Sequence, residues 1–173
     1  LLQSLSRASM RAVDGRGARR VLRALGIDAV TIRNADAGDL DLVFEWRNNP
    51  SVRAVSGSRE PIDASAHKSW FASVLSDQSR LLLIGEQRNK PIGVVRFDLK
   101  NGEAAVSIFL GPGMMGEGRG GELLHAAEAW LIANRPEVRV LKAEVLRDNE
   151  SSHRLFSACG YQRRSTLYAK EVR

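Results

Sequence analysis

The fold of this chain is decided by one glycine-rich stretch, Met115-Gly116-Glu117-Gly118-Arg119-Gly120-Gly121-Glu122-Leu123-Leu124. An apolar run precedes it at 106–110, and a helical pattern of apolar residues follows it as far as Leu131. This order predicts a strand, a loop without bulky side chains and the start of a helix. The first turn of a helix leaves main-chain N–H groups unpaired and carries the positive end of the helix dipole. Because glycines lack the Cβ atoms that would keep a phosphate away, the stretch predicts a diphosphate cradle.

Two common glycine motifs do not fit the stretch. The nucleotide-binding loop closes on Lys and Ser or Thr, where this chain has Gly121 and Glu122. The dinucleotide fingerprint fails because its third glycine is misplaced and the preceding strand does not open a βαβ unit. The pattern therefore indicates a phosphate-bearing ligand held mainly by main chain, with a flexible glycine-rich turn as the alternative.

The stretch resembles the first signature of the GNAT superfamily of N-acetyltransferases, Arg/Gln-x-x-Gly-x-Gly/Ala between strand four and the next helix. The run Gly118-Arg119-Gly120 takes the Gly-x-Gly positions, and Met115 stands where Arg or Gln is usual. Residues 149–161 resemble the second signature, Asn-x-x-Ser/Ala-x-x-Leu-Tyr-x-x-x-Gly-Phe. Two signatures at the expected separation are far more specific than one.

The composition fits one soluble domain with a short appendage. The chain has 173 residues, of which 43% are apolar and 27% charged, as is usual for globular proteins. No apolar run approaches the roughly 20 residues that a membrane helix needs. The single cysteine cannot form an internal disulfide, and no Cys/His cluster has zinc-binding spacing. We therefore expect a cytoplasmic protein without a membrane span or a metal site.

The basic character of the chain raises the question of nucleic-acid binding. The net charge is +6 and the pI about 10.1, but basic residues gather only at 11–23 and at Arg163 and Arg164, with few aromatic residues between them. A basic surface attracts small polyanions such as coenzyme A and sugar nucleotides equally well. We therefore predict small-molecule partners and no nucleic acid.

Residues 1–27 are predicted to be a tail or linker helix at the end of a preceding domain, ahead of a catalytic domain at 28–173. Within the tail, Met10–Leu22 resembles the last turn and helix of the UDP-sugar hydrolase of the pseudaminic acid pathway. The alternative is a basic linker helix that docks on a neighbouring surface. Since the sequence begins with Leu1 rather than Met, we expect a fragment of a longer protein, and the resemblance implies fusion to that hydrolase.

The periodicity of apolar residues predicts the order β-α-α-β-β-β-α-β-α-β. Strands are expected at 29–33, 80–86, 91–99, 103–110, 138–146, at Tyr161 and at 166–172, and helices after Asn34 or Asp36, from Asp63, at 120–134 and at 149–159. The strands at 80–110 would form an antiparallel meander. A crossover helix places strand 138–146 parallel to strand 103–110.

This order is that of the GNAT superfamily. The resemblance implies an α/β (α+β) acyl-CoA N-acyltransferase fold, with a mixed sheet of about seven strands and helices on both faces. Strands four and five would be parallel and splayed, admitting acetyl-CoA as cosubstrate. The coenzyme contacts implied by the two signatures are Phe109, Leu110, Met115, Gly116, Gly118, Arg119, Gly120, Gly121, Asn149, Ser152 and Phe156. Asn149 is also expected to cap its helix.

Acetylation of an amine needs a group that removes a proton from the acceptor, because amines are protonated near pH 7. Glu144 and His67 are the candidates, and the sequence does not decide between them. Relatives in the superfamily commonly place a tyrosine at the position of Phe156 to protonate the departing thiolate. Since phenylalanine cannot donate a proton, the role falls to water or to another side chain such as Tyr161.

The candidate acceptor site lies on two predicted helices. Trp46, Arg47 and Asn48 combine an aromatic plane, a forked donor and an amide, which suits recognition of a polar substrate. His67 and Trp70 lie one helical turn apart on the same face. The alternative interpretation is that Trp46 and the His67–Trp70 pair are packed in the core and that Arg47 caps helix-terminal carbonyls.

Together with Ala143-Glu144-Val145, these residues resemble the amino-sugar N-acetyltransferases of pseudaminic acid biosynthesis. Those enzymes acetylate the 4-amino group of a UDP-linked 4-amino-4,6-dideoxy sugar, so the resemblance implies a nucleotide-sugar acceptor in surface polysaccharide or nonulosonic acid biosynthesis. Two alternatives stay open: an acetyltransferase for protein N-termini or ribosomal proteins, and a catalytically silent coenzyme A sensor. The sequence also leaves a homodimer open.

Overall fold

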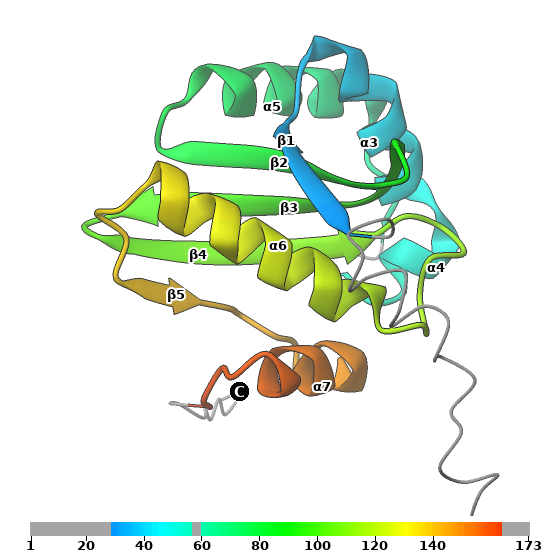
Figure 1. Cartoon of the computed structure of the whole chain (residues 1–173). Coiled ribbons are helices and arrows are strands. Elements are labelled where there is room, and N and C mark those ends of the chain that lie inside the picture. Colours follow the sequence, from blue (N-terminus) through cyan, green and yellow to red (C-terminus); the bar gives the residue numbers. More distant parts are fainter. Residues whose placement is uncertain (1–28, 57–59, 164–173) are drawn as a thin grey trace, which may run out of the picture.

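The computed structural model describes residues 29–56 and 60–163 of the chain. In this part, five strands form one sheet in the order β1-β2-β3-β4-β5, as Figure 1 shows. Neighbouring strands from β1 to β4 are antiparallel, and β5 runs parallel to β4. The strands are β1 (Val30–Asn34), β2 (Arg80–Gln87), β3 (Lys90–Lys100), β4 (Glu103–Leu110) and β5 (Val140–Lys142).

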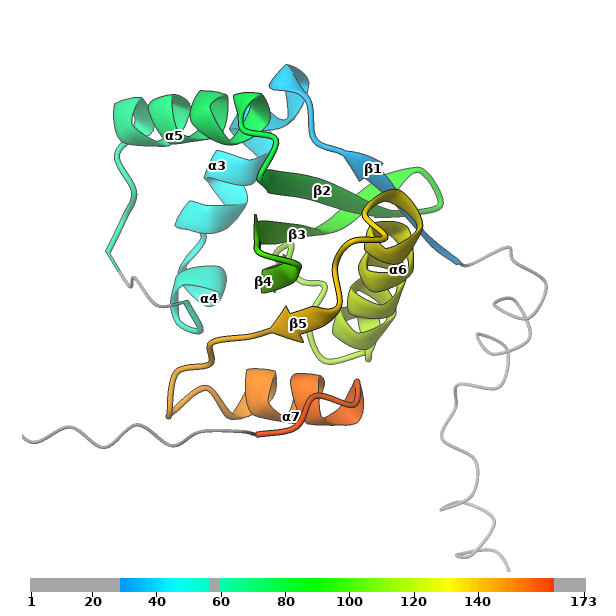
Figure 2. The same cartoon turned by 90° about the vertical axis from the view of Figure 1, so that its left-hand side faces the viewer.

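Helices cover both faces of this sheet, as the resemblance implied. Figure 2 shows α3 and α5 on one face, α6 on the opposite face and α7 beside the β5 end. The helical segments are η1 (Ala37–Asp39), α3 (Leu40–Asn48), α4 (Pro50–Arg53), α5 (Ala64–Ser76), α6 (Arg119–Asn134) and α7 (Glu150–Ala158). Within the described residues, the GNAT arrangement is therefore present.

The period-two alternation of the strands divides the core into two clusters. Leu82, Ile84 and Val94 are buried with α3 and α5, whereas Leu83 and Val95 are buried with α6. Successive side chains of a strand point to opposite faces of the sheet, so each strand contributes side chains to both core clusters. The apolar runs of β2 and β3 are continuous because both faces are covered.

Two parts of the predicted sheet were wrong. The described residues form five strands rather than about seven; Tyr161 lies outside any strand, and 166–172 lies outside the described part. The strand predicted at 138–146 is much shorter, because β5 pairs with β4 only from Val140 to Lys142. Its partners on β4 are Glu103 to Ala105.

The short pairing of β5 exposes the edge of β4. The strand continues to Leu110, although its register with β5 ends at Ala105. Within the described residues, no strand pairs with 106–110 on that side. We call this segment the open edge of β4. Its other side pairs with β3, so the main-chain groups that face away from β3 are the ones that can bind an extended ligand, which agrees with the predicted splaying of strands four and five.

The packing of α6 on the sheet depends on two paired glycines. Gly85 and Gly93 lie opposite each other on β2 and β3, and the side chain of Leu123 from α6 fills the space above them. A Cβ atom on Gly85 would lie 2.1 Å from Leu123 Cδ1, and one on Gly93 would lie 2.7 Å from the carbonyl oxygen of Phe109. These glycines therefore let α6 approach the sheet and keep the end of β4 in place.

We expect Gly85→Ala to lower the free energy of unfolding by about 1–3 kcal/mol, the usual cost of overpacking a well-filled core. Urea denaturation would measure the loss. Gly121→Ala is the matched control, because its Cβ would meet only Cys159 Sγ at 3.9 Å. Equal stability of the two variants would contradict the packing described for Leu123.

The predicted tail at 1–27 lies outside the described residues, and its resemblance to the hydrolase stays a prediction. In the part of the chain that the structure describes, no helix combines the length and hydrophobicity that a bilayer crossing requires. The same residues contain no group of three or more His, Cys, Asp or Glu side chains placed to hold a metal ion.

Candidate active site

The glycine-rich loop leads from the end of β4 into α6. Gly116 and Gly118 adopt φ angles of 89° and 76°, a left-handed conformation that other residues adopt only with strain. Gly118 is the N-cap of α6, and no side chain caps this helix. No atom lies within 4 Å of the position that a Cβ on either glycine would occupy. The loop therefore leaves room beside the start of α6, as a phosphate cradle requires, although the amides of Gly121 and Glu122 already donate to the carbonyl oxygen of Gly118.

The side chain of Arg119 folds back on this loop. Its Nη1 donates to Met114 Sδ at 2.9 Å, and its Nη2 lies 2.8 Å from Glu117 Oε2. Its Nε is buried without a hydrogen-bond partner. Met115 is 40% exposed on the loop. The cradle therefore consists mainly of main chain, and the loop is held by its own side chains.

The helix α7 lies behind the first turn of α6. A Cβ on Gly120 would make an ordinary contact with Leu155 at 3.5 Å. Phe156, predicted to contact the coenzyme, is only 8% exposed and packs in the core beneath α6. Ser152 donates its main-chain N–H to Asn149. Any coenzyme contact by Phe156 or Ser152 stays a prediction.

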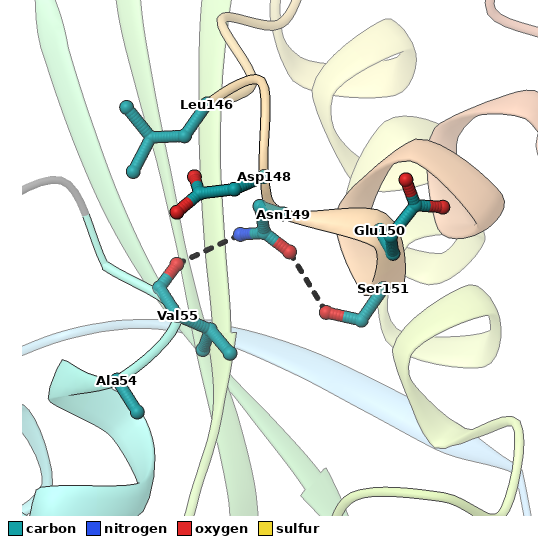
Figure 3. A pocket seen from close by; sticks show the side chains of 7 residues that line it. All are labelled: Ala54, Val55, Leu146, Asp148, Asn149, Glu150 and Ser151. Carbon is teal, nitrogen blue, oxygen red and sulfur yellow. Dashed lines mark hydrogen bonds between the residues drawn. The ribbon is translucent and has the colours of Figure 1, made fainter.

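Asn149 links α7 to the end of α4. Its Oδ1 accepts hydrogen bonds from Ser152 N at 3.0 Å and Ser151 Oγ at 2.8 Å, which confirms the predicted N-cap. Its Nδ2 donates to the carbonyl oxygen of Val55 at 2.8 Å. Figure 3 shows this bridge at a small pocket of about 90 Å³. The side chain therefore ties together two segments that are distant in sequence.

A larger cavity of about 330 Å³ lies on the α3 and α5 side of the sheet. It shares Ser107 and Phe109 with the open edge of β4, so it opens beside the same strand end as the glycine loop. We call it the acceptor cavity. Its lining residues are Arg47, Ile62, Ala66, His67, Trp70, Leu82, Val94, Arg96, Ser107 and Phe109.

His67 is the most buried polar group of the acceptor cavity, with 3% of its surface exposed. Its ring lies among those of Phe44, Trp70 and Phe71, at centroid distances of 5.2 to 5.8 Å. Its Nε2 is buried and has no hydrogen-bond partner. Burial lowers the pKa of His67 below its ordinary value, against an opposing hydrogen bond to the Leu40 main chain. The imidazole is therefore neutral at pH 7 and can accept a proton.

Arg47 also lines the acceptor cavity, with its Cζ 5.5 Å from the centroid of the Phe109 ring. Its Nη1 donates to Ser56 Oγ at 2.9 Å. Burial, and then the neighbouring charge of Arg96, lower the pKa of Arg47. The guanidinium stays charged, since an ordinary arginine titrates far above pH 7.

The neighbours of Arg47 on α3 do not line the cavity. A Cβ on Gly111 would lie 2.8 Å from the ring of Trp46, so the indole packs against the start of the glycine loop. Asn48 forms two hydrogen bonds with the main chain of Ile62, at 2.7 and 3.0 Å. Asn48 therefore holds the segment before α5 against α3. Substrate contacts by Trp46 and Asn48 stay predictions.

Two candidate catalytic residues lie away from the acceptor cavity. Glu144 is exposed beyond the end of β5 and is not among the residues that line the cavity. Tyr161 packs edge-on against Phe156, and its hydroxyl donates to Glu128 Oε1 at 2.8 Å. Burial, and then this hydrogen bond, raise the pKa of Tyr161 well above its ordinary value. A phenol with a raised pKa is a weaker acid.

We expect Tyr161→Phe to cost about 1 kcal/mol of stability through the lost hydrogen bond to Glu128 and to change kcat by less than about threefold. Thermal unfolding and steady-state kinetics on the same sample would measure the two effects. A large fall in kcat with unchanged stability would instead support the predicted role of Tyr161 as a proton donor.

Sequence reasoning missed Arg96 and Ser107, which lie opposite each other on β3 and β4 and line the acceptor cavity. Arg96 is a charged residue within a largely buried strand. Because residues two apart in a strand share a face, its spacing from Val94 was the signal that could have placed it on the same face as Val94. Val55 was missed as the partner of Asn149, because no local pattern reports a hydrogen bond between residues so distant in sequence.

The splayed β4 and β5, the uncapped glycine loop and the adjoining cavity define the acyltransferase class of α/β enzymes. The model of the Acetyltransferase (GNAT) domain family matches residues 29–162, so the chain belongs to this family. It is an N-acetyltransferase that uses acetyl-CoA.

Known proteins that resemble the chain include acetyltransferases for different amines. It is 26% identical over 156 residues to the aminoglycoside N(6')-acetyltransferase type 1 of Klebsiella pneumoniae, covering 81% of this chain and 77% of the relative. The structure of AAC(6')-Ib with ribostamycin and coenzyme A superposes with a TM-score of 0.72 at 23% identity, covering 81% and 87% of the two chains. The structure of the spermidine N-acetyltransferase of Vibrio cholerae with coenzyme A and spermine superposes with a TM-score of 0.71 at 20% identity. The match covers 80% of this chain and 83% of that one.

Proposed function

We propose that this chain transfers the acetyl group of acetyl-CoA to the amino group of a nucleotide-linked amino sugar, a UDP-linked 4-amino-4,6-dideoxy sugar. The observation that carries the proposal is the position of the acceptor cavity. It takes Ser107 and Phe109 from the open edge of β4, so an amine held in it lies beside the strand along which the coenzyme would extend.

The lining of the cavity supports a sugar-nucleotide acceptor. Trp70 and Phe109 offer ring faces for a sugar or a base, and Arg47 and Arg96 bring positive charge toward a diphosphate. None of the described lining residues is Asp or Glu. The resemblance of Trp46-Arg47-Asn48 and of the His67–Trp70 pair to the pseudaminic acid enzymes points to the same acceptor.

The coenzyme contacts follow from the fit of the loop. Acetyl-CoA supplies an acetyl thioester, whose carbonyl carbon is attacked by an amine. The amides at the start of α6, among them those of Gly118, Arg119 and Gly120, would hold the diphosphate, and the open edge of β4 at Phe109 and Leu110 would pair with the pantetheine. No side chain of the described residues occupies the Cβ positions of Gly116 and Gly118, so the cradle fits the group.

We assign the proton-accepting role to His67 rather than Glu144. His67 lines the acceptor cavity and carries a buried, unpartnered Nε2, whereas Glu144 does not line the cavity. A neutral imidazole at this position removes the proton of an acceptor ammonium, which leaves the amine free to attack. The proton donor to the departing thiolate stays open between water and Tyr161.

Release of free thiol from acetyl-CoA tests the proposal directly. We expect turnover with the UDP-linked 4-amino sugar, and much slower turnover with kanamycin, spermidine and basic peptides. Faster acetylation of the peptides would favour the protein acetyltransferase instead. Tight coenzyme binding without turnover of any amine would favour the silent sensor. The pathway, the hydrolase fusion, the homodimer and the cytoplasmic location stay predictions.

A further inference from the structure

Arg47 is a partly buried cation of the acceptor cavity whose charge no acidic partner balances. Its polar contact is with the hydroxyl of Ser56, and its Cζ lies 5.5 Å from the centroid of the Phe109 ring. Neither partner carries a charge. Within the described residues, no ion pair joins Arg47 to Asp or Glu. Removing a cation from water without an anionic partner is costly, so the site is electrostatically incomplete.

A second guanidinium increases the imbalance. Arg96 lines the same cavity and binds Asp98 at 2.9 Å. That carboxylate also accepts from Arg80 at 3.3 Å. One carboxylate therefore serves two arginines, and none is left for Arg47. The local positive potential favours a ligand with a negative charge.

The contacts of Arg47 leave its forked donors available. A guanidinium carries five N–H groups in a plane, and the bond to Ser56 uses one of them. The contacts with Ser56 and Phe109 restrain the side chain, which limits the entropy lost when an anion binds. Planar, paired N–H donors match the spacing of carboxylate and phosphate oxygens.

We propose that Arg47 binds an anionic group of the acceptor, a phosphate or a carboxylate, and so selects anion-bearing amines over polycationic ones. The inference rests on the proposed function in taking this cavity as the acceptor site, but it does not require a nucleotide sugar. The anion lies on Arg47 and the amine reaches toward His67, which lines the same cavity. Spermine and aminoglycosides carry several positive charges, which two lining arginines would repel.

Calorimetry on the full chain, saturated with coenzyme A, tests the assignment. Saturation blocks the cradle at α6, so added anions report on the acceptor cavity. UDP and inorganic phosphate represent phosphates, and malonate represents carboxylates. We expect Arg47→Gln to weaken whichever class binds by about 10- to 100-fold, the usual worth of a hydrogen-bonded charge pair. Arg47→Lys keeps the charge but loses the fork and should lie between.

Arg139→Gln is the matched control, because it removes one exposed arginine at the other end of β4 and β5 and should leave anion affinity unchanged. With an amine that the enzyme acetylates, Arg47→Gln should raise the KM for that amine far more than it lowers kcat. Equal anion affinity of wild type and Arg47→Gln would overturn the proposal, as would faster turnover of spermidine than of any anion-bearing amine. Binding of malonate but not UDP would contradict the proposed nucleotide-sugar acceptor, whereas it would support the anion-binding role of Arg47.

Discussion

Gly120→Asp is expected to weaken acetyl-CoA binding by at least about 100-fold. The new carboxylate would stand at the second helical position of α6, where the coenzyme diphosphate is proposed to bind, and like charges brought together in an interface cost several kcal/mol. The same carboxylate interacts favourably with the positive end of the helix dipole. A Cβ at this position would, however, meet Leu155 and Leu110 at 3.5 to 3.9 Å, so the carboxylate would lie against apolar side chains, and the folded apo protein should be less stable than wild type. Calorimetric titration with acetyl-CoA and thermal unfolding would measure the two effects separately.

Gly120→Ala is the matched control for this prediction. Its Cβ would meet Leu155 at 3.5 Å, an ordinary contact, and alanine is an allowed residue at this position of the GNAT signature. We expect a loss of affinity below about tenfold, because main-chain amides still reach the phosphate. Wild-type affinity in Gly120→Asp would contradict the placement of the diphosphate at α6.

His67→Gln is expected to lower kcat by about 100-fold or more, the usual contribution of a positioned general base. Glutamine keeps a polar side chain but cannot take up a proton. Single-turnover acetylation with saturating acetyl-CoA would isolate this step. Glu144→Gln is the control, and we expect its kcat to stay within about threefold of wild type. The opposite ranking of the two variants would transfer the role to Glu144.

The pH dependence offers an independent check on His67. Burial lowers its pKa from an ordinary value of 6.5, so the neutral form persists below pH 6.5. In wild type, kcat should fall with pH only through this lowered pKa, and His67→Gln should remove that acidic limb. Folding stability should also fall as the pH is lowered. Because His67 has the higher pKa in the unfolded chain, the unfolded chain takes up the proton first, and the free energy of unfolding decreases as the pH falls below 6.5. An acidic limb centred above pH 7 would contradict the assignment.

Local patterns predicted most of the elements. The bounds of β4 agree with the predicted 103–110, and Asp63 and Asn149 cap their helices as expected. Capping and strand alternation depend on neighbours in sequence, so one segment contains the information. The length of β5 does not follow from such a pattern. It depends on where the chain diverges from β4, which alternation within 138–146 cannot report.

The site was predicted less completely, for reasons of geometry. Successive helical residues point about 100° apart, so the consecutive Trp46, Arg47 and Asn48 cannot share one cavity. Only Arg47 lines it, while its neighbours hold the loop and the segment before α5. Arg96 was missed because strand alternation places it on the face of Val94 but does not show that a cavity lies over that face.

A crystal structure of the chain with acetyl-CoA would test the central claim most directly. The account predicts diphosphate oxygens within hydrogen-bonding distance, about 3 Å, of amide nitrogens at the start of α6. It also predicts the pantetheine along the open edge of β4, with the thioester beside the acceptor cavity near Phe109 and His67. A coenzyme bound elsewhere, with the first-turn amides of α6 left without phosphate, would contradict it.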